Sequence, residues 1–119
     1  MTEKKIDEQI ALLNIRDVRA GCRAMKALQQ ASRENIRVYA YMDRFAQLME
    51  NGNSYVRTRA LILIAANAQW DVDHKIDKIL GSYLRHITDA KPITARQCIQ
   101  SLPVIAEYKP ELKRRLARR

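Results

Sequence analysis

The densest group of side chains able to bind a metal lies in the second half of the sequence. It contains three acids and a histidine: Asp71, Asp73, His74 and Asp77. Carboxylates and imidazoles are common metal ligands, but acids at a helix start also cap free backbone amides and suit the helix dipole. Since Asp73 and Asp77 fall at the start of an expected helix, we predict capping and no metal. His86 is too far along the chain to form a local ligand pair with His74.

No arrangement typical of an enzyme is present. The three glycines, Gly21, Gly52 and Gly81, are isolated and form no phosphate-binding loop, and the motifs Gly-x-Ser-x-Gly, His-Glu-x-x-His and Cys-x-x-Cys are absent. Cys22 and Cys98 match neither a zinc signature nor a disulfide framework, so we expect two thiols and no bond between them. We therefore predict a non-catalytic protein with no cofactor.

Composition narrows the class of protein further. The chain has 119 residues, 47% of them hydrophobic, and a net charge of +9, which fits one folded domain rather than a disordered chain. The longest wholly apolar run, 60–66, is too short to span a membrane. Since the first residues also lack an apolar signal core, we expect a cytoplasmic protein with no membrane partner.

The positions of the apolar residues predict helices throughout. Apolar side chains recur every three or four residues, and helix-favouring residues dominate. Turn signals at 51–53, 90–92 and 109–110 divide the pattern. After a first helix carrying Ile6, Ile10 and Leu13, the expected helices cover residues 17–32, 34–50, 55–69, 73–88, 92–107 and 111–119. In the second of these seven helices, Val18, Cys22, Met25 and Leu28 are expected to face the core.

Taken two by two, the first six expected helices form three pairs. The second helices of these pairs, at 17–32, 55–69 and 92–107, repeat with a period of 38 residues. This spacing separates Val18, Val56 and Thr94, and also Cys22, Ala60 and Cys98. A two-helix unit cannot bury its own apolar stripe, whereas stacked units share a continuous core. The middle copy should then be the most apolar, and its segment ALILIAA meets that expectation.

These units resemble the HEAT repeat, whose turn and second helix read Asp, four residues, Val-Arg, two residues, Ala. The middle unit matches best, the third lacks Val-Arg, and the first has a turn one residue shorter; the matching residues are Asn51, Val56, Arg57 and Ala60, then Asp89 and Cys98, then Asn14, Val18, Arg19 and Cys22. The resemblance implies an all-α, right-handed superhelical stack. Its three repeats cover approximately 1–32, 33–70 and 71–108, and a short capping helix lies in 109–119.

The resemblance also implies roles for side chains on the second helices. In HEAT repeats the arginine after the inward valine binds the turn acid of a neighbouring repeat. Here Arg19 and Arg57 would form this structural ladder with Asn51 and Asp89. The second helices of HEAT repeats line the concave surface, where six basic or amide residues of this chain fall: Arg23, Lys26, Arg59, Arg96, Gln97 and Gln100. Such a row is compatible with binding an acidic protein segment or phosphates, and also with a solvated helix face.

Much of the positive charge lies at the C-terminus. Residues 109–119 hold six Lys or Arg and one Glu, which leaves +4 for residues 1–108. Leu112 and Leu116 are expected to pack as a cap, with Arg114, Arg115, Arg118 and Arg119 outward. A basic tail is compatible with binding nucleic acid or anionic surfaces, and cations also suit the C-terminus of a helix.

These observations favour a binding or adaptor module that holds a protein partner on its second-helix face. One alternative is nucleic-acid binding through the same face and the tail, since HEAT-like DNA alkylation-repair proteins resemble this chain distantly. Another is a structural repeat fragment that self-associates through an exposed end.

Overall fold

The computed structural model describes residues 1–117, and every regular element in that range is helical. The seven α-helices are α1 (Glu3–Leu12), α2 (Val18–Glu34), α3 (Met42–Leu48), α4 (Ser54–Ala66), α5 (Lys75–Arg85), α6 (Pro92–Tyr108) and α7 (Lys113–Ala117). Four short 3-10 helices join them: η1 (Arg37–Tyr41), η2 (Ala68–Trp70), η3 (His86–Thr88) and η4 (Pro110–Leu112). The all-α prediction is confirmed. None of the described helices combines the length and apolar character needed to cross a bilayer.

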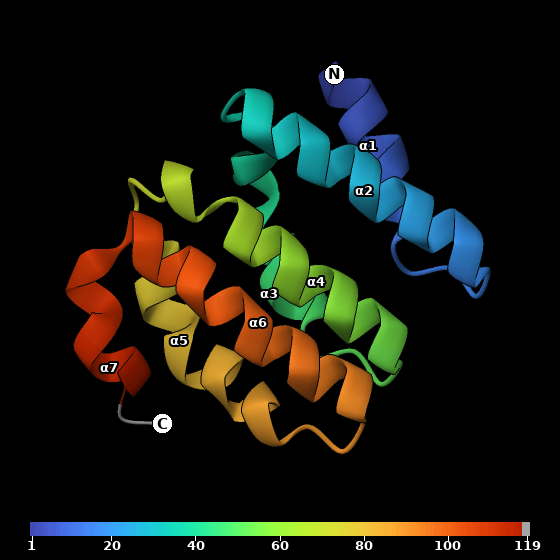
Figure 1. Cartoon of the computed structure of the whole chain (residues 1–119). Helices are drawn as coiled ribbons and strands as arrows, with labels where there is room; N and C mark the ends of the chain where they lie inside the picture. The colour runs from blue at the N-terminus through green and yellow to red at the C-terminus, as the bar shows by residue number, and fades with distance from the viewer. Residues whose placement is uncertain (118–119) are drawn as a thin grey trace.

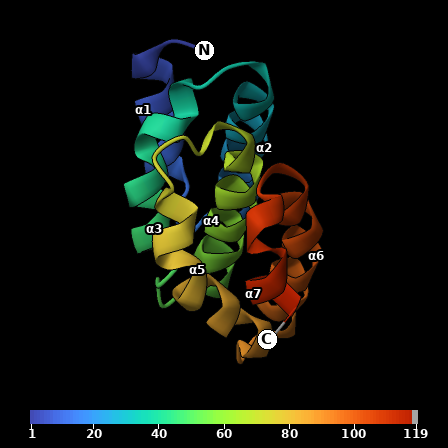
Figure 2. The same cartoon turned by 90° about the vertical axis from the view of Figure 1, so that its left-hand side faces the viewer.

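The helices form two layers. In Figure 1, α2, α4 and α6 lie side by side. The view in Figure 2 separates this layer from a second one formed by α1, α3 and α5. The Cα trace is only 18 Å thick along its shortest axis, which is the thickness of two packed helix layers. The short helix α7 packs at the end of this arrangement, next to α6.

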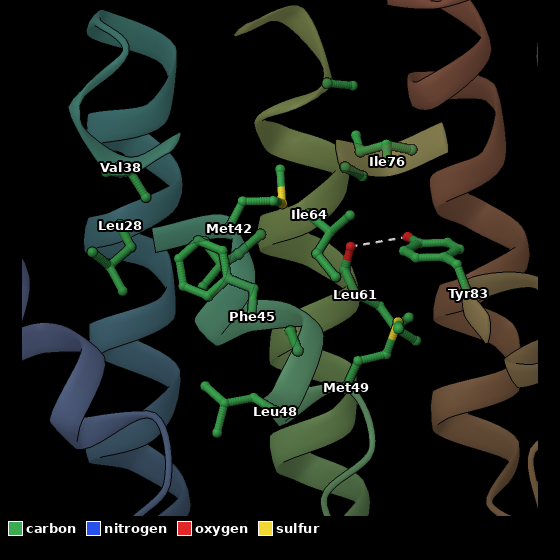
Figure 3. Packing of buried hydrophobic residues seen from close by; sticks show 14 of the residues in the cluster. Leu28, Val38, Met42, Phe45, Leu48, Met49, Leu61, Ile64, Ile76 and Tyr83 are labelled. Atoms are coloured by element: carbon green, nitrogen blue, oxygen red, sulfur yellow. Dashed lines mark hydrogen bonds between the residues drawn. The ribbon is translucent and has the colours of Figure 1, made fainter. Parts of the chain in front are cut away.

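The core fills the space between the layers, with α4 at its centre. Leu61, Leu63 and Ile64 of α4 are fully buried because α2, α6 and α3 all pack against this helix. Figure 3 shows Met42 and Phe45 of α3 in the core beside Leu61 and Ile64 of α4. The Tyr83 hydroxyl donates a hydrogen bond of 2.9 Å to the Leu61 carbonyl across the core. The expected burial of the middle second helix is therefore confirmed.

The predicted helix 34–50 is two elements rather than one. Asn35 has an extended backbone (φ −164°), and its side chain accepts a hydrogen bond from the Arg37 amide. This local bond competes with helix continuation. The chain resumes as η1 and then α3, so a single long helix was the wrong prediction here.

The start of α5 also differs from expectation. The capping acid is Asp71, whose carboxylate accepts hydrogen bonds from the Lys75 and Ile76 amides at 2.9 and 3.0 Å. Between Asp71 and these two amides the chain turns at His74, whose backbone has the left-handed conformation with φ 55°. The prediction that Asp73 caps this helix is wrong, because the turn brings Asp71 back over the first free amides.

Val18 is exposed, in contrast to the expected inward position. Asp17 caps α2 by accepting a hydrogen bond from the Ala20 amide, so Val18 is the first helical residue and lies beyond the packed surface. Met25 and Leu28 are buried as predicted, Cys22 is partly buried, and Gly21 is buried as well.

Candidate functional site on the α2, α4 and α6 layer

A groove of about 210 Å³ lies over the C-terminal half of α4, between α2 and α6. Its floor is Ile62, Ala65 and Ala66, and the two alanines keep the floor low. Both walls are mostly polar. The α2 wall is Gln29 and Arg33, the α6 wall is Gln97, Gln100, Ser101, Val104 and Tyr108, and Gln69 lies beyond the end of α4.

The six residues predicted for a partner-binding face separate into three groups. Gln97 and Gln100 line the groove. Arg23, Lys26 and Arg96 are exposed on the same helix layer but do not line it, and Arg59 is buried. Other lining residues, among them Gln29, Arg33 and Tyr108, were not predicted from the sequence. For Arg33 a signal was present, since it follows Lys26 by seven residues, which is two helical turns.

Arg59 is a structural residue, which corrects its predicted role in partner binding. Only 5% of it is exposed. Its guanidinium donates hydrogen bonds to the Leu13 carbonyl at 2.9 Å and to the Val18 carbonyl at 3.3 Å. It lies against Gly21, where a Cβ atom would overlap it. Arg59 therefore joins α4 to the start of α2 and is not available to a ligand.

The positive charge is concentrated on this layer. Helices α2, α4 and α6 carry seven Lys or Arg and two acids, whereas α1, α3 and α5 carry six and five. Arg57 is paired with an acid and Arg59 is buried, which leaves five exposed cations: Arg19, Arg23, Lys26 and Arg33 on α2, and Arg96 on α6. The exposed charge of this layer therefore belongs mainly to α2.

One rung of the expected ladder is present. Arg57 donates to both carboxylate oxygens of Asp89, with Nε–Oδ2 and Nη2–Oδ1 distances of 3.0 and 2.8 Å. The same guanidinium also donates to the carbonyls of Asn51 and Gly52. His86 lies 3.0 Å from Asp89 through its Nδ1 atom.

The rung expected between Arg19 and Asn51 is absent. The Arg19 side chain is exposed and has no hydrogen bond or ion pair with any other residue in 1–117. Asn51 instead donates from its side-chain amide to Asn14 Oδ1 at 3.2 Å. A neutral asparagine in the turn offers Arg19 no charge, so the prediction for this pair is wrong.

The ion pair of Asp89 is expected to make the free energy of unfolding fall at acid pH. The hydrogen bonds from Arg57 hold the pKa of Asp89 well below its usual range, against the opposing effect of burial. Its charged form therefore adds stability above pH ~4, and this stability is lost as the pH falls through the lowered pKa. We expect Asp89→Asn to lower the free energy of unfolding by about 2 kcal/mol at pH 7.

Urea denaturation of both proteins from pH 7 down to pH 2 checks this prediction. The difference between them should shrink towards the acid end, because Asp89 of the unfolded wild-type chain binds a proton below pH ~4 and folding must then remove it. A difference that stays constant over the whole range would contradict the assigned role of the Asp89 charge. Glu107→Gln, at an exposed acid of α6, is the control and should show little effect.

Two acids of the group around His74, Asp71 and Asp77, form ion pairs with Lys109. Lys109 Nζ, nearly fully buried, lies 3.0 Å from Asp71 Oδ2 and 2.7 Å from Asp77 Oδ1. Ligand atoms of His74, Asp77 and Glu111 lie within 4.8 Å of one another. Lys109 already brings a positive charge to Asp77, and its Nζ is also 3.7 Å from Glu111. Lys109, Asp71 and Asp77 therefore form an ion-pair cluster in which Lys109 and Asp71 are buried, whereas His74 and Glu111 are exposed.

No protein-family model matches this sequence, and neither does any curated protein or solved structure. Functional inference for this chain therefore depends on its own residues and their arrangement.

The remaining candidates have mainly structural positions. Leu112 and Leu116 are buried as expected. Arg114 and Arg115 are exposed on α7, and Arg115 donates to the Asp77 carbonyl at 3.3 Å. Arg118 and Arg119 lie outside the described residues.

Trp70 and the two cysteines also have structural surroundings. Trp70 is partly buried against the core, and its Nε1 donates to the Ser32 carbonyl at 2.7 Å. Cys22 and Cys98 do not form a disulfide, as predicted. None of these three side chains lines the groove.

Proposed function

We propose that this chain is a non-catalytic binding module that holds a segment of a protein partner in the groove over α4. The main observation that supports this proposal is the shape and lining of the groove. Its low floor of Ile62, Ala65 and Ala66 can receive an apolar side chain, and its amide and hydroxyl walls can form hydrogen bonds with a partner. It lies on the helix layer with the excess positive charge.

The proposed architecture is a HEAT-like stack in which α1–α2, α3–α4 and α5–α6 are the three repeats and α7 is the cap. Two observations support it: the layers of first and second helices, and the Arg57–Asp89 ion pair between neighbouring turns. The groove would then lie on the inner, concave side, where the second helices of neighbouring repeats converge.

The residues of the groove favour binding over catalysis. Its lining includes no His, Cys, Asp or Glu, the groups that most often perform nucleophilic or acid–base chemistry. A protein segment also fits better than a nucleic acid. Bases bind by stacking on aromatic platforms, and Tyr108 is the one aromatic residue that lines the groove.

Substitution of Ala66 by Gln tests the proposal. The change adds a neutral side chain that fills the groove floor, so it should block a bound segment without altering charge. We expect peptides selected on the wild-type chain from a random twelve-residue display library to lose at least about tenfold in affinity. Binding can be measured by fluorescence polarisation.

Ala46→Gln is the matched control, because Ala46 lines a similar hollow of about 200 Å³ between α3 and α5 on the opposite layer. It should leave the affinity unchanged. If no peptide is selected, or if Ala66→Gln and Ala46→Gln have equal effects, the groove is not the binding site and the proposal fails.

A further inference from the structure

We propose that the segment held in this groove is an acidic, extended stretch of polypeptide that places its carboxylates towards α2 and its uncharged side towards α6. This inference rests on the proposed function and adds the chemistry and the orientation of the partner.

The two walls of the groove differ in charge. On α2, Arg33 is part of the wall, and Lys26 and Arg19 precede it at intervals of seven residues. Because seven residues are nearly two helical turns, these three cations lie along one line of α2. On α6, the lining residues are all uncharged, and the exposed charges Arg96 and Glu107 do not line the groove.

The cations of α2 are available to a partner. Arg19, Arg23 and Lys26 are exposed, and none of their side chains has an ion pair or a hydrogen bond with another residue in 1–117. Arg33 donates to the neutral side chain of Gln30 at 3.0 Å and has no acid partner within the same range. The single acid of α2 is Glu34, at its last position. Carboxylates of a partner are therefore the complementary groups, and exposed arginines can bind them in a bidentate manner.

The uncharged lining favours an extended segment. Gln29 and Gln100 lie on opposite walls, and neither side chain has a hydrogen bond within residues 1–117. Each amide can donate and accept at once. An extended chain presents unpaired backbone N–H and C=O groups at this level, whereas a helix has already paired its own. Arg19 and Arg33 are about 21 Å apart along α2, which matches about six extended residues.

A charge-swap selection tests the inference. Random twelve-residue peptides are displayed and selected on the wild-type chain and on the double variant Lys26→Glu/Arg33→Glu. Wild-type selection should enrich Asp and Glu, and the variant should enrich Lys and Arg instead. The acidic peptides should bind the variant at least about tenfold more weakly.

The control is Lys78→Glu/Arg85→Glu, which makes the same change in net charge on exposed residues of α5. It should still select acidic peptides and bind them within about twofold of wild type. A neutral variant, Lys26→Gln/Arg33→Gln, should lose the preference for acids without gaining one for bases. Circular dichroism checks that each variant is folded.

The outcomes separate the two proposals. Groove-dependent peptides that show no preference for acids would overturn the inference and leave the proposed function standing. An equal loss in the α5 control would assign the effect to net charge and overturn the inference too. If a twenty-nucleotide oligouridine probe binds with a steep salt dependence that Lys26→Glu abolishes, the α2 cations are a phosphate site rather than a peptide site. Failure to select any peptide would remove both proposals.

Discussion

Replacing Lys109 by Met is expected to lower the free energy of unfolding by about 3–5 kcal/mol, which is a large part of the total stability of a domain of this size. The ammonium group of Lys109 is the counterion of Asp71 and Asp77, and 3% of the residue is exposed. Methionine fills a similar volume but leaves two carboxylates without their cation. Burial of an unpaired charge costs far more than an exposed ion pair contributes.

The surrounding hydrogen bonds explain why the loss is large. Asp71 accepts a hydrogen bond of 2.6 Å from the Tyr39 hydroxyl and two more from the backbone at the start of α5. Burial alone would raise the pKa of Asp71, but these hydrogen bonds and Lys109 lower it instead. One carboxylate therefore joins η1, α5 and the segment after α6, and Lys109 stabilises its charged form.

The effect should depend on pH in a defined direction. The lowered pKa of Asp71 means that its contribution is present above pH ~4 and is lost on acidification. For Lys109, burial alone would lower the pKa, but Asp77 and Asp71 raise it above its usual value, so its contribution is lost only in strong alkali. The difference between wild type and Lys109→Met should be greatest near neutral pH and shrink towards pH 2.

Urea denaturation over this pH range measures the difference. Lys113→Met, at an exposed lysine of α7, is the control and should change the free energy of unfolding by no more than about 0.5 kcal/mol. Equal effects of the two substitutions at pH 7 would show that the buried ion pairs do not stabilise the fold.

Gly21→Ala is expected to lower the free energy of unfolding by about 2 kcal/mol, although alanine favours helices more than glycine does. A Cβ atom at Gly21 would overlap the guanidinium of Arg59. The side chain would have to leave the Leu13 and Val18 carbonyls, to which it donates two hydrogen bonds. Their loss outweighs the gain of about 1 kcal/mol in helix propensity.

A double-mutant cycle tests the assigned cause. In the background of Arg59→Ala the overlap is gone, so Gly21→Ala should become stabilising by about 0.5–1 kcal/mol. Gly81→Ala is the matched control, because a Cβ at this position of α5 would meet no atom within 4 Å apart from its chain neighbours and the backbone of its own helix. It should stabilise the wild-type protein by a similar amount. If Gly21→Ala destabilises equally with and without Arg59, another contact limits the size of residue 21.

The helices and the central position of α4 could be predicted because both follow from local patterns. The spacing of apolar residues fixes the side of a helix that is buried, and the 38-residue period identifies the helix that is covered on both sides. The errors arose where a single polar side chain competes with a helix. The Asn35 side chain interrupts the helix predicted over 34–50 near its start, and Asp71 rather than Asp73 caps α5.

The candidate site was only partly predictable. Gln97, Gln100 and Lys26 could be assigned to the second-helix layer from their register. The groove itself could not be foreseen, because its lining comes from three helices that are distant in sequence and its low floor depends on two alanines of the middle helix. The spacing of Arg33 placed it on the line of Lys26, but no sequence signal showed that it forms part of a wall.

The sequence by itself determined the helical class, the order of the helices and the row of basic and amide residues on the second helices, because propensity, periodicity and composition are properties of the chain. Only the tertiary structure decided which charges remain available. Carbonyls and acids that are distant in sequence bind three of the cations, Arg57, Arg59 and Lys109. Four others remain exposed to solvent: Arg19, Arg23, Lys26 and Arg33. The physical reason is that a charge stabilises the fold or binds a partner according to its three-dimensional neighbours, which sequence spacing does not specify.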